Sequence, residues 1–351
     1  MNTVTVGASV SYNVLVGSGL LPEIGARILE LNKKPCRIAL ISDSTVMPLY
    51  GGAVRSSLES SGFTVCAYDF PAGEASKNIF TYQKILEFLA ESHVTRSDMI
   101  VALGGGVTGD MAGFAAATYL RGVRFVQVPT TLLAMVDSSV GGKTAVDLPV
   151  GKNLVGAFHQ PSLVLCDVDT LSTLPPEIFR DGCAEVIKYG VLYDPRLFDH
   201  LQQHGLAFDR NYVITRSIEL KRDVVMEDEF DTGARQKLNL GHTIGHGIEA
   251  SSQFSITHGS AVAAGMCIVS RAAAAKGTCA KEDAMRICAV VEKFGLPTKT
   301  DFDAEILARC ALSDKKRFGG TVNLIVPKAI GDCTILPTPV EMLSDFIKAG
   351  L

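Results

Sequence analysis

Two histidines one helical turn apart are the first residues of this chain that could bind a metal ion. His242 and His246 stand at positions i and i+4, so on a helix both side chains lie on one face and suit a single ion. His258 follows them, and Glu185 is an acidic residue among apolar neighbours with Lys188 one turn further on. Because buried carboxylates are rare unless paired or metal-bound, this pattern predicts a site of two histidines and one carboxylate. The alternative is a pair of capping histidines and a surface ion pair between Glu185 and Lys188.

A glycine-rich run at 104–110 could bind phosphate groups. Gly104, Gly106 and Gly109 fit the pattern G-x-G-x-x-G between a predicted strand and a predicted helix, where glycine lets the backbone approach a pyrophosphate. The run belongs to about the fourth predicted strand, whereas a Rossmann site uses the first. The acidic residue expected after the next strand is also missing, so an ordinary Rossmann site is not indicated. We expect dinucleotide or phosphate binding here, with Asp43 as ribose partner. A plain strand–helix turn is the alternative.

Lysines in a second glycine-rich region could bind an anionic substrate. The run at 137–144 ends in Gly-Gly-Lys-Thr, but Asp137 stands where a P-loop requires glycine. Lys143, and then Lys152 and Asn153, place two ammonium groups and an amide in mostly apolar surroundings. This set suits a phosphorylated or carboxylated small molecule. A flexible loop is the alternative.

Alternating strand and helix patterns must position these residues in the first half of the chain. Continuous runs of valine, isoleucine and leucine predict parallel strands that are covered on both faces. Such strands are expected at residues 12–16, 37–42, 64–69, 99–103, 124–128 and 163–167. Helical spacing between them, for example at 77–91, predicts a doubly wound α/β sheet.

The second half is predicted to be mainly helical. Two prolines and an early acidic residue at 175–177 begin a helix, and helical patterns continue to about residue 312. The charged run at 218–239 is interpreted as a solvated helix face, and 321–326 as a short strand. We therefore place the domain boundary near residue 172, which gives domains at 1–172 and 173–351.

Composition excludes several classes of protein. The 351 residues are 47% hydrophobic and 20% charged, which is incompatible with wholesale disorder. A formal net charge of −4 gives no indication of a nucleic-acid or membrane partner. Nine scattered cysteines indicate reduced thiols in a cytoplasmic protein rather than a disulfide framework or a zinc finger.

Across nearly its whole length, the sequence resembles the 3-dehydroquinate synthases, a family of sugar-phosphate cyclases. The resemblance rests on five runs in order: GGGVTGD at 104–110, RGVRFVQVPTT at 121–131, DSSVGGK at 137–143, EVIK at 185–188 and NLGHTIGH at 239–246. It implies an N-terminal, NAD-binding α/β domain with a mostly parallel sheet, and a mainly α-helical, metal-binding C-terminal domain. It also implies a homodimer.

The resemblance assigns roles to individual residues. Glu185, His242 and His258 would bind Zn²⁺, or Co²⁺, and His246 would face the substrate instead of sharing the ion with His242. The residues implied at the NAD site are Asp43, Glu74, Lys77, Gly105, Gly106, Asp110, Thr130 and Thr131. The residues implied as catalytic are Asp137, Lys143, Lys188 and His246. Those implied to bind substrate are Arg121 from the neighbouring subunit, Lys152, Asn153, Lys221, Arg235, Asn239 and Lys316.

The implied reaction belongs to the shikimate pathway of aromatic amino acid biosynthesis. Its substrate would be 3-deoxy-D-arabino-heptulosonate 7-phosphate, whose carboxylate and phosphate explain the cationic residues. The resemblance implies transient oxidation by NAD, phosphate elimination, re-reduction, ring opening and an intramolecular aldol closure to 3-dehydroquinate. The alternatives are another sugar-phosphate cyclase, a metal-dependent oxidoreductase of the glycerol dehydrogenase type, and a non-catalytic nucleotide-binding module.

Overall fold

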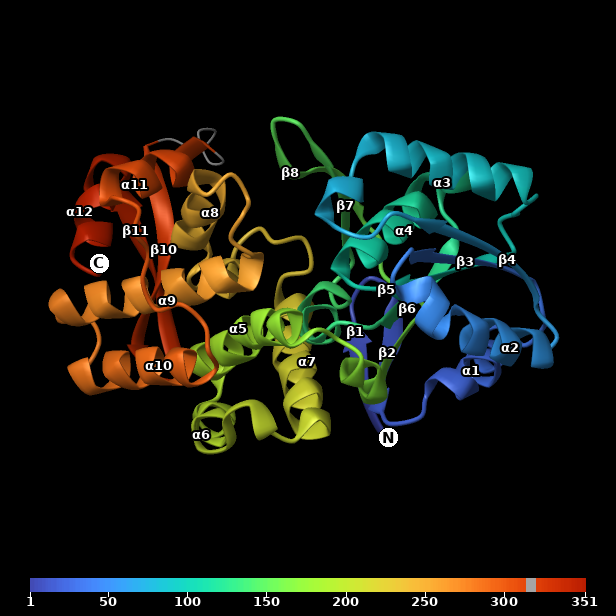
Figure 1. Ribbon diagram of the computed structural model, residues 1–351, viewed down its shortest axis with the longest axis horizontal. Helices are drawn as coiled ribbons and strands as arrows, with labels where there is room; N and C mark the ends of the chain where they lie inside the picture. Colours follow the sequence, from blue (N-terminus) through green and yellow to red (C-terminus); the bar gives the residue numbers. More distant parts are fainter. Residues whose placement is uncertain (314–319) are drawn as a thin grey trace. The chain divides into compact units, whose positions relative to one another are not determined.

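The computed structural model describes residues 1–313 and 320–351, so the substrate-binding role predicted for Lys316 lies outside the described residues. The chain divides into two compact units (Figure 1). The first comprises Met1–Leu174 and Arg210–Phe230, and the second comprises Pro175–Asp209 and Asp231–Leu351. The sequence-based division at residue 172 assigns 210–230 to the second domain, whereas in the structure this segment packs with the first unit.

A seven-stranded sheet forms the centre of the first unit. The spatial order is β1-β2-β9-β6-β5-β3-β4, and only β1 and β2 pair in antiparallel fashion. The strands are β1 (Asn2–Gly7), β2 (Ser11–Gly17), β3 (Arg37–Asp43), β4 (Thr64–Phe70), β5 (Met99–Gly104), β6 (Arg124–Pro129) and β9 (Leu163–Asp167). The strands expected from continuous apolar runs are confirmed, and β5 and β9 are buried along their whole length.

Helices cover both faces of this sheet (Figure 1). Helices α1 (Ile24–Asn32) and α2 (Gly52–Ser60) contribute apolar side chains to the core on one face, together with side chains of β3 and β5. Helices α3 (Ile79–Glu91) and α4 (Gly106–Thr118) do the same on the other face. This is the doubly wound α/β arrangement that the alternating sequence pattern predicts.

The strand order creates a switch point at the carboxyl edge of the sheet. From β3 the chain continues to β4 on one side, whereas from β5 it continues to β6 on the other. The crevice outside the carboxyl ends of β3 and β5 is therefore the place where an open α/β sheet ordinarily binds a ligand. Asp43 ends β3, and the glycine-rich run begins at the end of β5.

The sequence patterns predict neither the hairpin at residues 143–158 nor the packing of the helix at 210–227 with the first unit. Strands β7 (Lys143–Leu148) and β8 (Gly151–Phe158) form an antiparallel hairpin that packs against α4. Helix α7 (Arg210–Glu227) packs against β1 and the short helix at Ala134–Ser138. The sequence indicates that 210–227 is helical, but helical periodicity cannot reveal which neighbours the helix contacts.

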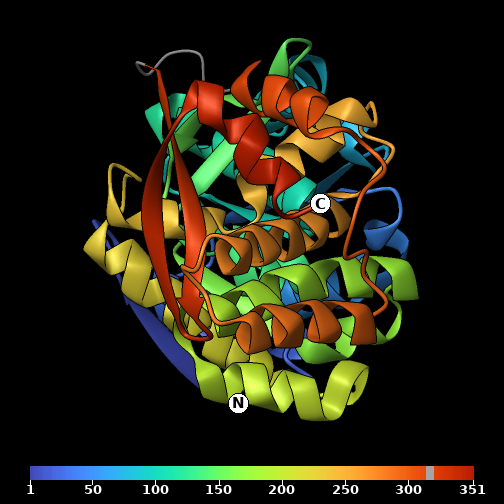
Figure 2. The ribbon, with the colours of Figure 1, turned by 90° about the vertical axis from the view of Figure 1, so that its left-hand side faces the viewer.

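The second unit is mainly helical, with one antiparallel hairpin whose strands are visible in Figure 2. The helices are α5 (Pro176–Tyr193), α6 (Pro195–His204), α8 (His242–Ser251), α9 (His258–Ala275), α10 (Lys281–Lys293), α11 (Ala304–Ser313) and α12 (Leu343–Lys348). The hairpin joins β10 (Thr321–Ala329) to β11 (Asp332–Pro339), and only the first of these strands was predicted. No helix in the described ranges has both the length and the hydropathy that a membrane crossing requires.

Close contact between α8 and α9 depends on glycine. A β-carbon on Gly265 would lie 2.2 Å from the carbonyl oxygen of Gly241, and one on Gly245 would lie 3.1 Å from that of Ala261. Gly241 has a φ of 79°, a left-handed conformation that favours glycine. Because these positions lack side chains, the backbones of the two helices approach each other at the end where His242 begins α8.

We predict that Gly265→Ala destabilises the protein, because the added methyl group forces α8 and α9 apart. The expected loss is about 1–3 kcal/mol in the free energy of unfolding, measured by denaturant titration. Gly52→Ala is the matched control, since a β-carbon there has no neighbour within 4 Å. Equal stability of the two variants would contradict the importance of this helix contact.

Candidate active site

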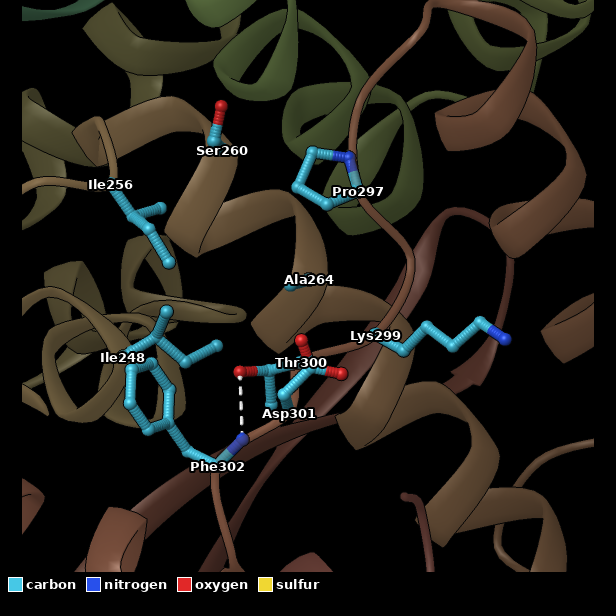
Figure 3. A pocket seen from close by; sticks show the side chains of 9 residues that line it. All are labelled: Ile248, Ile256, Ser260, Ala264, Pro297, Lys299, Thr300, Asp301 and Phe302. Atoms are coloured by element: carbon cyan, nitrogen blue, oxygen red, sulfur yellow. Dashed lines mark hydrogen bonds between the residues drawn. The ribbon is translucent and has the colours of Figure 1, made fainter. Parts of the chain in front are cut away.

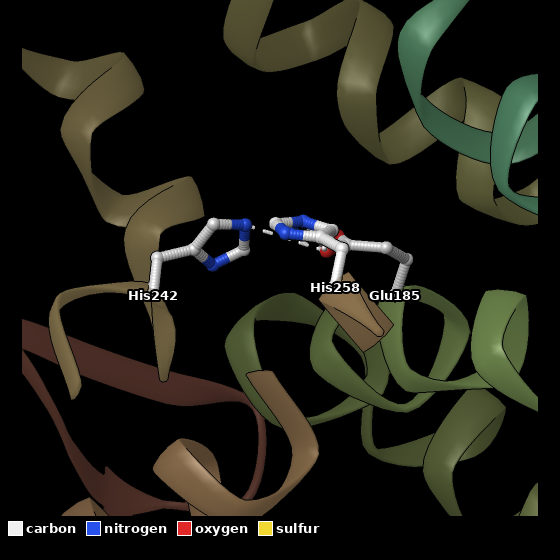
Figure 4. A group of neighbouring side chains, drawn as sticks. All are labelled: Glu185, His242 and His258. Atoms are coloured by element: carbon white, nitrogen blue, oxygen red, sulfur yellow. Dashed lines mark ion pairs between the residues drawn. The ribbon is translucent and has the colours of Figure 1, made fainter. Parts of the chain in front are cut away.

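Three helices of the second unit bring two histidines and a carboxylate together (Figure 4). Glu185 projects from the middle of α5, while His242 and His258 are the first residues of α8 and α9. The Nε2 atoms of His242 and His258 lie 3.4 and 3.8 Å from Oε1 of Glu185. The ligand atoms of all three residues lie within 4.8 Å of one another, as a group that binds one metal ion requires.

The other ring nitrogen of each histidine is held by a neighbouring group. Nδ1–H of His242 donates to the carbonyl oxygen of Leu240 at 3.1 Å, and Nδ1 of His258 lies 3.2 Å from Oε2 of Glu249. These contacts leave Nε2 of both rings directed toward Glu185. Metal-binding histidines are ordinarily fixed in this way by a carbonyl or a carboxylate.

The charges around the two imidazoles also suit a cation. Burial lowers the pKa of His242 and the nearby charge of Lys188 lowers it further, which favours the neutral imidazole that binds metals. Burial alone would lower the pKa of His258 as well. Its hydrogen bond to Glu249 and the charge of Glu185 outweigh burial and raise the pKa. Two carboxylates thus face two rings, and a divalent cation would balance their charge.

Asp181 fixes the start of α9 relative to α5. Its carboxylate oxygens accept the backbone N–H groups of Gly259 at 3.0 Å and Ser260 at 2.8 Å. N–H groups in the first turn of a helix have no acceptor within the helix, so the carboxylate of Asp181 supplies one. Its negative charge also interacts favourably with the positive end of the α9 dipole. Because Asp181 lies one turn before Glu185 on α5, this cap holds His258 beside its carboxylate.

Lys188 and His246 lie around the metal group. The ammonium group of Lys188 forms an ion pair with Oε2 of Glu185, and both side chains are buried. His246 forms a second group with Glu249 and His258, and its ring centroid lies 5.6 Å from that of His242. No candidate group in the part of the chain that the structure describes joins His242 and His246, which the i, i+4 spacing had suggested. Glu185, His242 and His258 form the group implied by the resemblance.

The first unit gathers the residues predicted for NAD at the carboxyl edge of its sheet. Thr130 follows β6, and its backbone N–H donates to the carbonyl oxygen of Gly104 at the end of β5. Its hydroxyl oxygen is buried without a hydrogen-bond partner among the described residues. A β-carbon on Gly105 would lie 3.1 Å from the side chain of Thr131, so the backbone of Gly105 lies close to that side chain. The N-terminus of α4 follows directly and favours a pyrophosphate.

Asp43 lies at the same edge of the sheet, at the end of β3. Its carboxylate accepts backbone N–H groups of Thr45 and Val46 at 2.9 and 3.0 Å, and the hydroxyl of Thr108 at 3.4 Å. Asp43 therefore connects the turn after β3 to the first turn of α4.

A buried lysine links the glycine-rich helix to the β7–β8 hairpin. Nζ of Lys77 lies 2.7 Å from Oδ2 of Asp110 and donates to Oδ1 of Asn153 at 2.5 Å. Burial tends to lower the pKa of Lys77, but the charge and hydrogen bond of Asp110, together with the charges of Glu74 and Asp147, outweigh burial and raise the pKa. Asn153 has a φ of 56°, and its N–H donates to Asp147 at 2.7 Å. Lys77 thus binds the side chain of Asn153, a residue whose backbone adopts an unusual conformation.

Two cationic residues of the run 218–239 are buried, so its interpretation as a solvated face is wrong for them. Lys221 of α7 is 5% exposed, and its Nζ lies 2.9 Å from Oδ1 of Asp137 and 2.5 Å from the carbonyl oxygen of the same residue. Arg235, on the short helix Ala234–Asn239 of the second unit, is 3% exposed. A pattern of mixed charges indicates a helix surface but does not show which charges have a buried partner.

The remaining predicted residues fall into two groups, one in each unit. Lys143 and Asn153 are exposed on the β7–β8 hairpin. On the same hairpin, Nζ of Lys152 lies 3.8 Å from Oε1 of Glu74. Arg121 is exposed on the first unit and has a φ of 67°. Asn239 ends the short helix that carries Arg235 in the second unit. Sequence reasoning missed Asp181 and Glu249, although Glu249 stands only three residues after His246.

The second unit also contains a cavity of about 220 Å³ (Figure 3). Its lining is Ile248, Ile256, Ser260, Ala264, Pro297, Lys299, Thr300, Asp301 and Phe302. This lining includes none of the predicted site residues and a single lysine. The cavity therefore lacks the several cations that a phosphorylated sugar acid requires.

Solved structures with this fold define the class of protein. A 2-deoxy-scyllo-inosose synthase complexed with carbaglucose-6-phosphate, NAD⁺ and Co²⁺ matches with a TM-score of 0.89 and 27% identity over 100% of both chains. A 2-epi-5-epi-valiolone synthase from Streptomyces hygroscopicus with NAD⁺ and Zn²⁺ bound matches with a TM-score of 0.88 and 28% identity over 99% of this chain and 97% of that one. The fold is that of the sugar-phosphate cyclases.

Similarity in sequence identifies the family. The models for the N-terminal and C-terminal parts of 3-dehydroquinate synthase match residues 67–181 and 182–317. The 3-dehydroquinate synthase of Streptococcus suis (strain 05ZYH33) is 46% identical over 96% of this chain and 97% of its own length. That of Pelobacter propionicus is 47% identical over 97% of each. The chain belongs to the 3-dehydroquinate synthase family and is an enzyme of the lyase class.

The fold is also similar, more distantly, to that of a glycerol dehydrogenase. The enzyme from Schizosaccharomyces pombe matches with a TM-score of 0.64 and 17% identity over 96% of this chain and 88% of that one. This likeness extends to the fold alone.

We predict that Glu249→Gln weakens metal binding about 10–100-fold, because His258 loses the carboxylate that orients its ring. Zinc affinity is measured by competition with a chromophoric chelator. Glu305→Gln, an exposed residue in the first turn of α11, is the control and should bind zinc as the unmodified protein does. Unchanged affinity in Glu249→Gln would show that Glu249 does not support the metal ligand.

Proposed function

We propose that this chain converts 3-deoxy-D-arabino-heptulosonate 7-phosphate into 3-dehydroquinate and inorganic phosphate, with NAD and a zinc ion as cofactors. The observation that carries the proposal is the convergence of Glu185, His242 and His258 in a member of the 3-dehydroquinate synthase family. The structural relatives with bound NAD⁺ and Zn²⁺ or Co²⁺ support the choice of cofactors.

The donor set fits zinc. Two imidazole nitrogens and one carboxylate oxygen are a common ligand set of catalytic zinc, and they leave positions for substrate oxygens. When bound, the metal would polarise a substrate hydroxyl, and NAD would accept a hydride and later return it, so that no net oxidation results. Glu185 would supply Oε1 to the ion while Lys188 retains Oε2.

The NAD site is proposed at the carboxyl edge of the first unit's sheet. The N-terminus of α4 and the glycines before it would bind the pyrophosphate, and Asp43 would accept from a ribose hydroxyl. The buried hydroxyl of Thr130 offers a further polar contact. Thr131, Glu74 and Lys77 are proposed to complete this site, with Asp110 holding Lys77.

The substrate carries a carboxylate and a phosphate, and cationic side chains would bind both. The proposed contacts are Lys143, Lys152, Asn153, Lys188, Lys221, Arg235, Asn239 and Lys316. Lys221 and Arg235 are buried, so ion pairs made there would be stronger than pairs in bulk water.

Asp137 is proposed to orient Lys221 rather than to contact the substrate anion. Both its carboxylate and its carbonyl oxygen contact the Lys221 ammonium group. These two contacts fix the direction of the Lys221 ammonium group. Without the Lys221 ammonium group beside it, the carboxylate of Asp137 would repel an anionic substrate.

His246 is the proposed proton carrier. It lies one turn beyond His242 on α8, near the metal group but outside the set formed by Glu185, His242 and His258. Histidine is the side chain that most readily changes its protonation state near neutral pH. A proton could therefore move at its ring while the metal ligands stay unprotonated.

A homodimer and a cytoplasmic location complete the proposal. Arg121 is exposed and has a backbone conformation unusual for a residue with a side chain, which suits contact with a second copy. All nine cysteines are free thiols, as is typical of a reducing compartment.

The activity is tested with purified protein, the heptulosonate phosphate and substoichiometric NAD. We expect many phosphate ions released per NAD, with no accumulation of NADH absorbance, because the hydride returns within each turnover. Steady production of NADH would instead identify a net oxidoreductase. Phosphate release without 3-dehydroquinate would point to a different cyclase.

Two substitutions separate metal binding from proton transfer. Glu185→Gln removes a metal ligand with little change in volume, so bound zinc and turnover should be lost together. His246→Ala should retain zinc, measured by elemental analysis, and should turn over more slowly. Loss of zinc in His246→Ala would instead make His246 a ligand, as the i, i+4 spacing allows.

Mixing two inactive variants tests the role of Arg121. In a heterodimer of Arg121→Ala and Glu185→Gln, one site has an intact metal group and receives Arg121 from its neighbour. Random exchange of subunits in a 1:1 mixture should therefore restore about one quarter of the activity. If subunits exchange but activity stays at the level of the separate variants, Arg121 does not act across a dimer.

A further inference from the structure

Two cysteines and an arginine meet where α9 packs against α10 in the second unit. Cys267 and Arg271 lie one turn apart on α9, and Cys288 lies on α10. Nη1 of Arg271 is 3.7 Å from Sγ of Cys288, which in turn is 4.0 Å from the carbonyl oxygen of Cys267. Cys267 is buried and Cys288 is half-buried, so small solutes can reach only the second thiol readily. None of the three residues has a role in the proposed reaction.

No carboxylate of the described residues forms an ion pair with the guanidinium group of Arg271. Nε donates to the carbonyl oxygen of Gly350 at 2.6 Å, and Nη1 donates to that of Thr298 at 2.9 Å. Nη2 is buried and has no hydrogen-bond partner within residues 1–313 and 320–351. A charge in such surroundings is costly unless an anion accompanies it. Among the described groups that contact this guanidinium group, the sulfur of Cys288 is the one that can become an anion.

The two sulfur atoms differ in acidity. The hydrogen bond from the Cys267 thiol, aided by the charge of Arg271, lowers the pKa of Cys288 to about 7 despite burial. Cys267 keeps the proton, and its pKa is raised by the same hydrogen bond, by burial and by the charges of Cys288 and Glu292. By contrast, burial raises the pKa of Cys36 and Cys166. The pair thus has one reactive sulfur and one protonated neighbour.

We propose that Cys288 is a peroxide-reactive thiol and that Cys267 is its disulfide partner. The guanidinium of Arg271 stabilises the Cys288 thiolate, and the half-buried position of Cys288 admits a small hydroperoxide. Thiolates beside a cationic group are the usual targets of such oxidants, and a neighbouring thiol is the usual second reactant.

The reaction balances with a hydroperoxide as oxidant. The Cys288 sulfur forms a bond to the terminal oxygen, the O–O bond breaks, and the leaving oxygen takes a proton from water. The Cys267 sulfur then attacks the Cys288 sulfur. An S–S bond forms, the S–O bond breaks, and the departing hydroxide takes the Cys267 proton to give water. The two sulfurs together lose two electrons, which reduce the peroxide.

Treatment of the folded protein with hydrogen peroxide tests the proposal. Remaining thiols are alkylated, and peptides are identified by mass spectrometry. We expect the peptide linked through Cys267 and Cys288 to form at least about tenfold faster than any oxidised product of Cys36 or Cys66, which are also half-buried. Equal rates at these sites would overturn the proposal.

The pH dependence of alkylation provides a second test. Reaction of Cys288 with iodoacetamide should be half-maximal near pH 7, where an ordinary thiol requires about pH 8.5. In Cys267→Ala the midpoint should rise, and dimedone should trap a sulfenic acid at Cys288 that has no partner to resolve it. Cys166→Ala, a buried cysteine on β9, is the matched control and should leave the midpoint unchanged. A midpoint of 8.5 in the unmodified protein would refute the activated thiol.

Discussion

The contact between the starts of α8 and α9 determines where a metal ion can bind. Gly241 and Gly265 remove the side chains that would separate these helices, and Asp181 holds the first turn of α9 against α5. In this arrangement the Nε2 atoms of His242 and His258 face the same oxygen of Glu185. Contacts to Leu240 and Glu249 then fix the orientation of the two rings. The metal group is therefore a property of helix packing and not of one sequence motif.

In the first unit, the parallel sheet and a few buried charges have the corresponding role. Strand order brings Asp43, Gly105 and Thr130 to one edge, although they are far apart in the sequence. Lys77 connects Asp110 of α4 to Asn153 of the hairpin, and Lys221 connects α7 to Asp137. Each of these pairs joins a residue of one element to a residue of another, so folding sets their positions before any ligand binds.

The sequence predicts those features that depend on local patterns. Continuous apolar runs identify the central parallel strands, and distinctive motifs point to Glu185, His242 and His258. Other features depend on contacts between distant segments. The spacing of His242 and His246 suggested one shared ion, but side chains on a single helix cannot show that α9 supplies a histidine to the same group. The return of α7 to the first unit and the cap provided by Asp181 have no local signal, because each arises from tertiary packing.

The position of bound zinc tests this account most directly. Crystals of the zinc-loaded protein, with anomalous scattering measured at the zinc edge, would locate the ion independently of any assumption about its ligands. The account predicts one ion bound by Nε2 of His242, Nε2 of His258 and a carboxylate oxygen of Glu185, with nitrogen and oxygen distances of about 2.0–2.2 Å. An ion bound by His246 and Glu249, with Glu185 remaining bound only to Lys188, would contradict it.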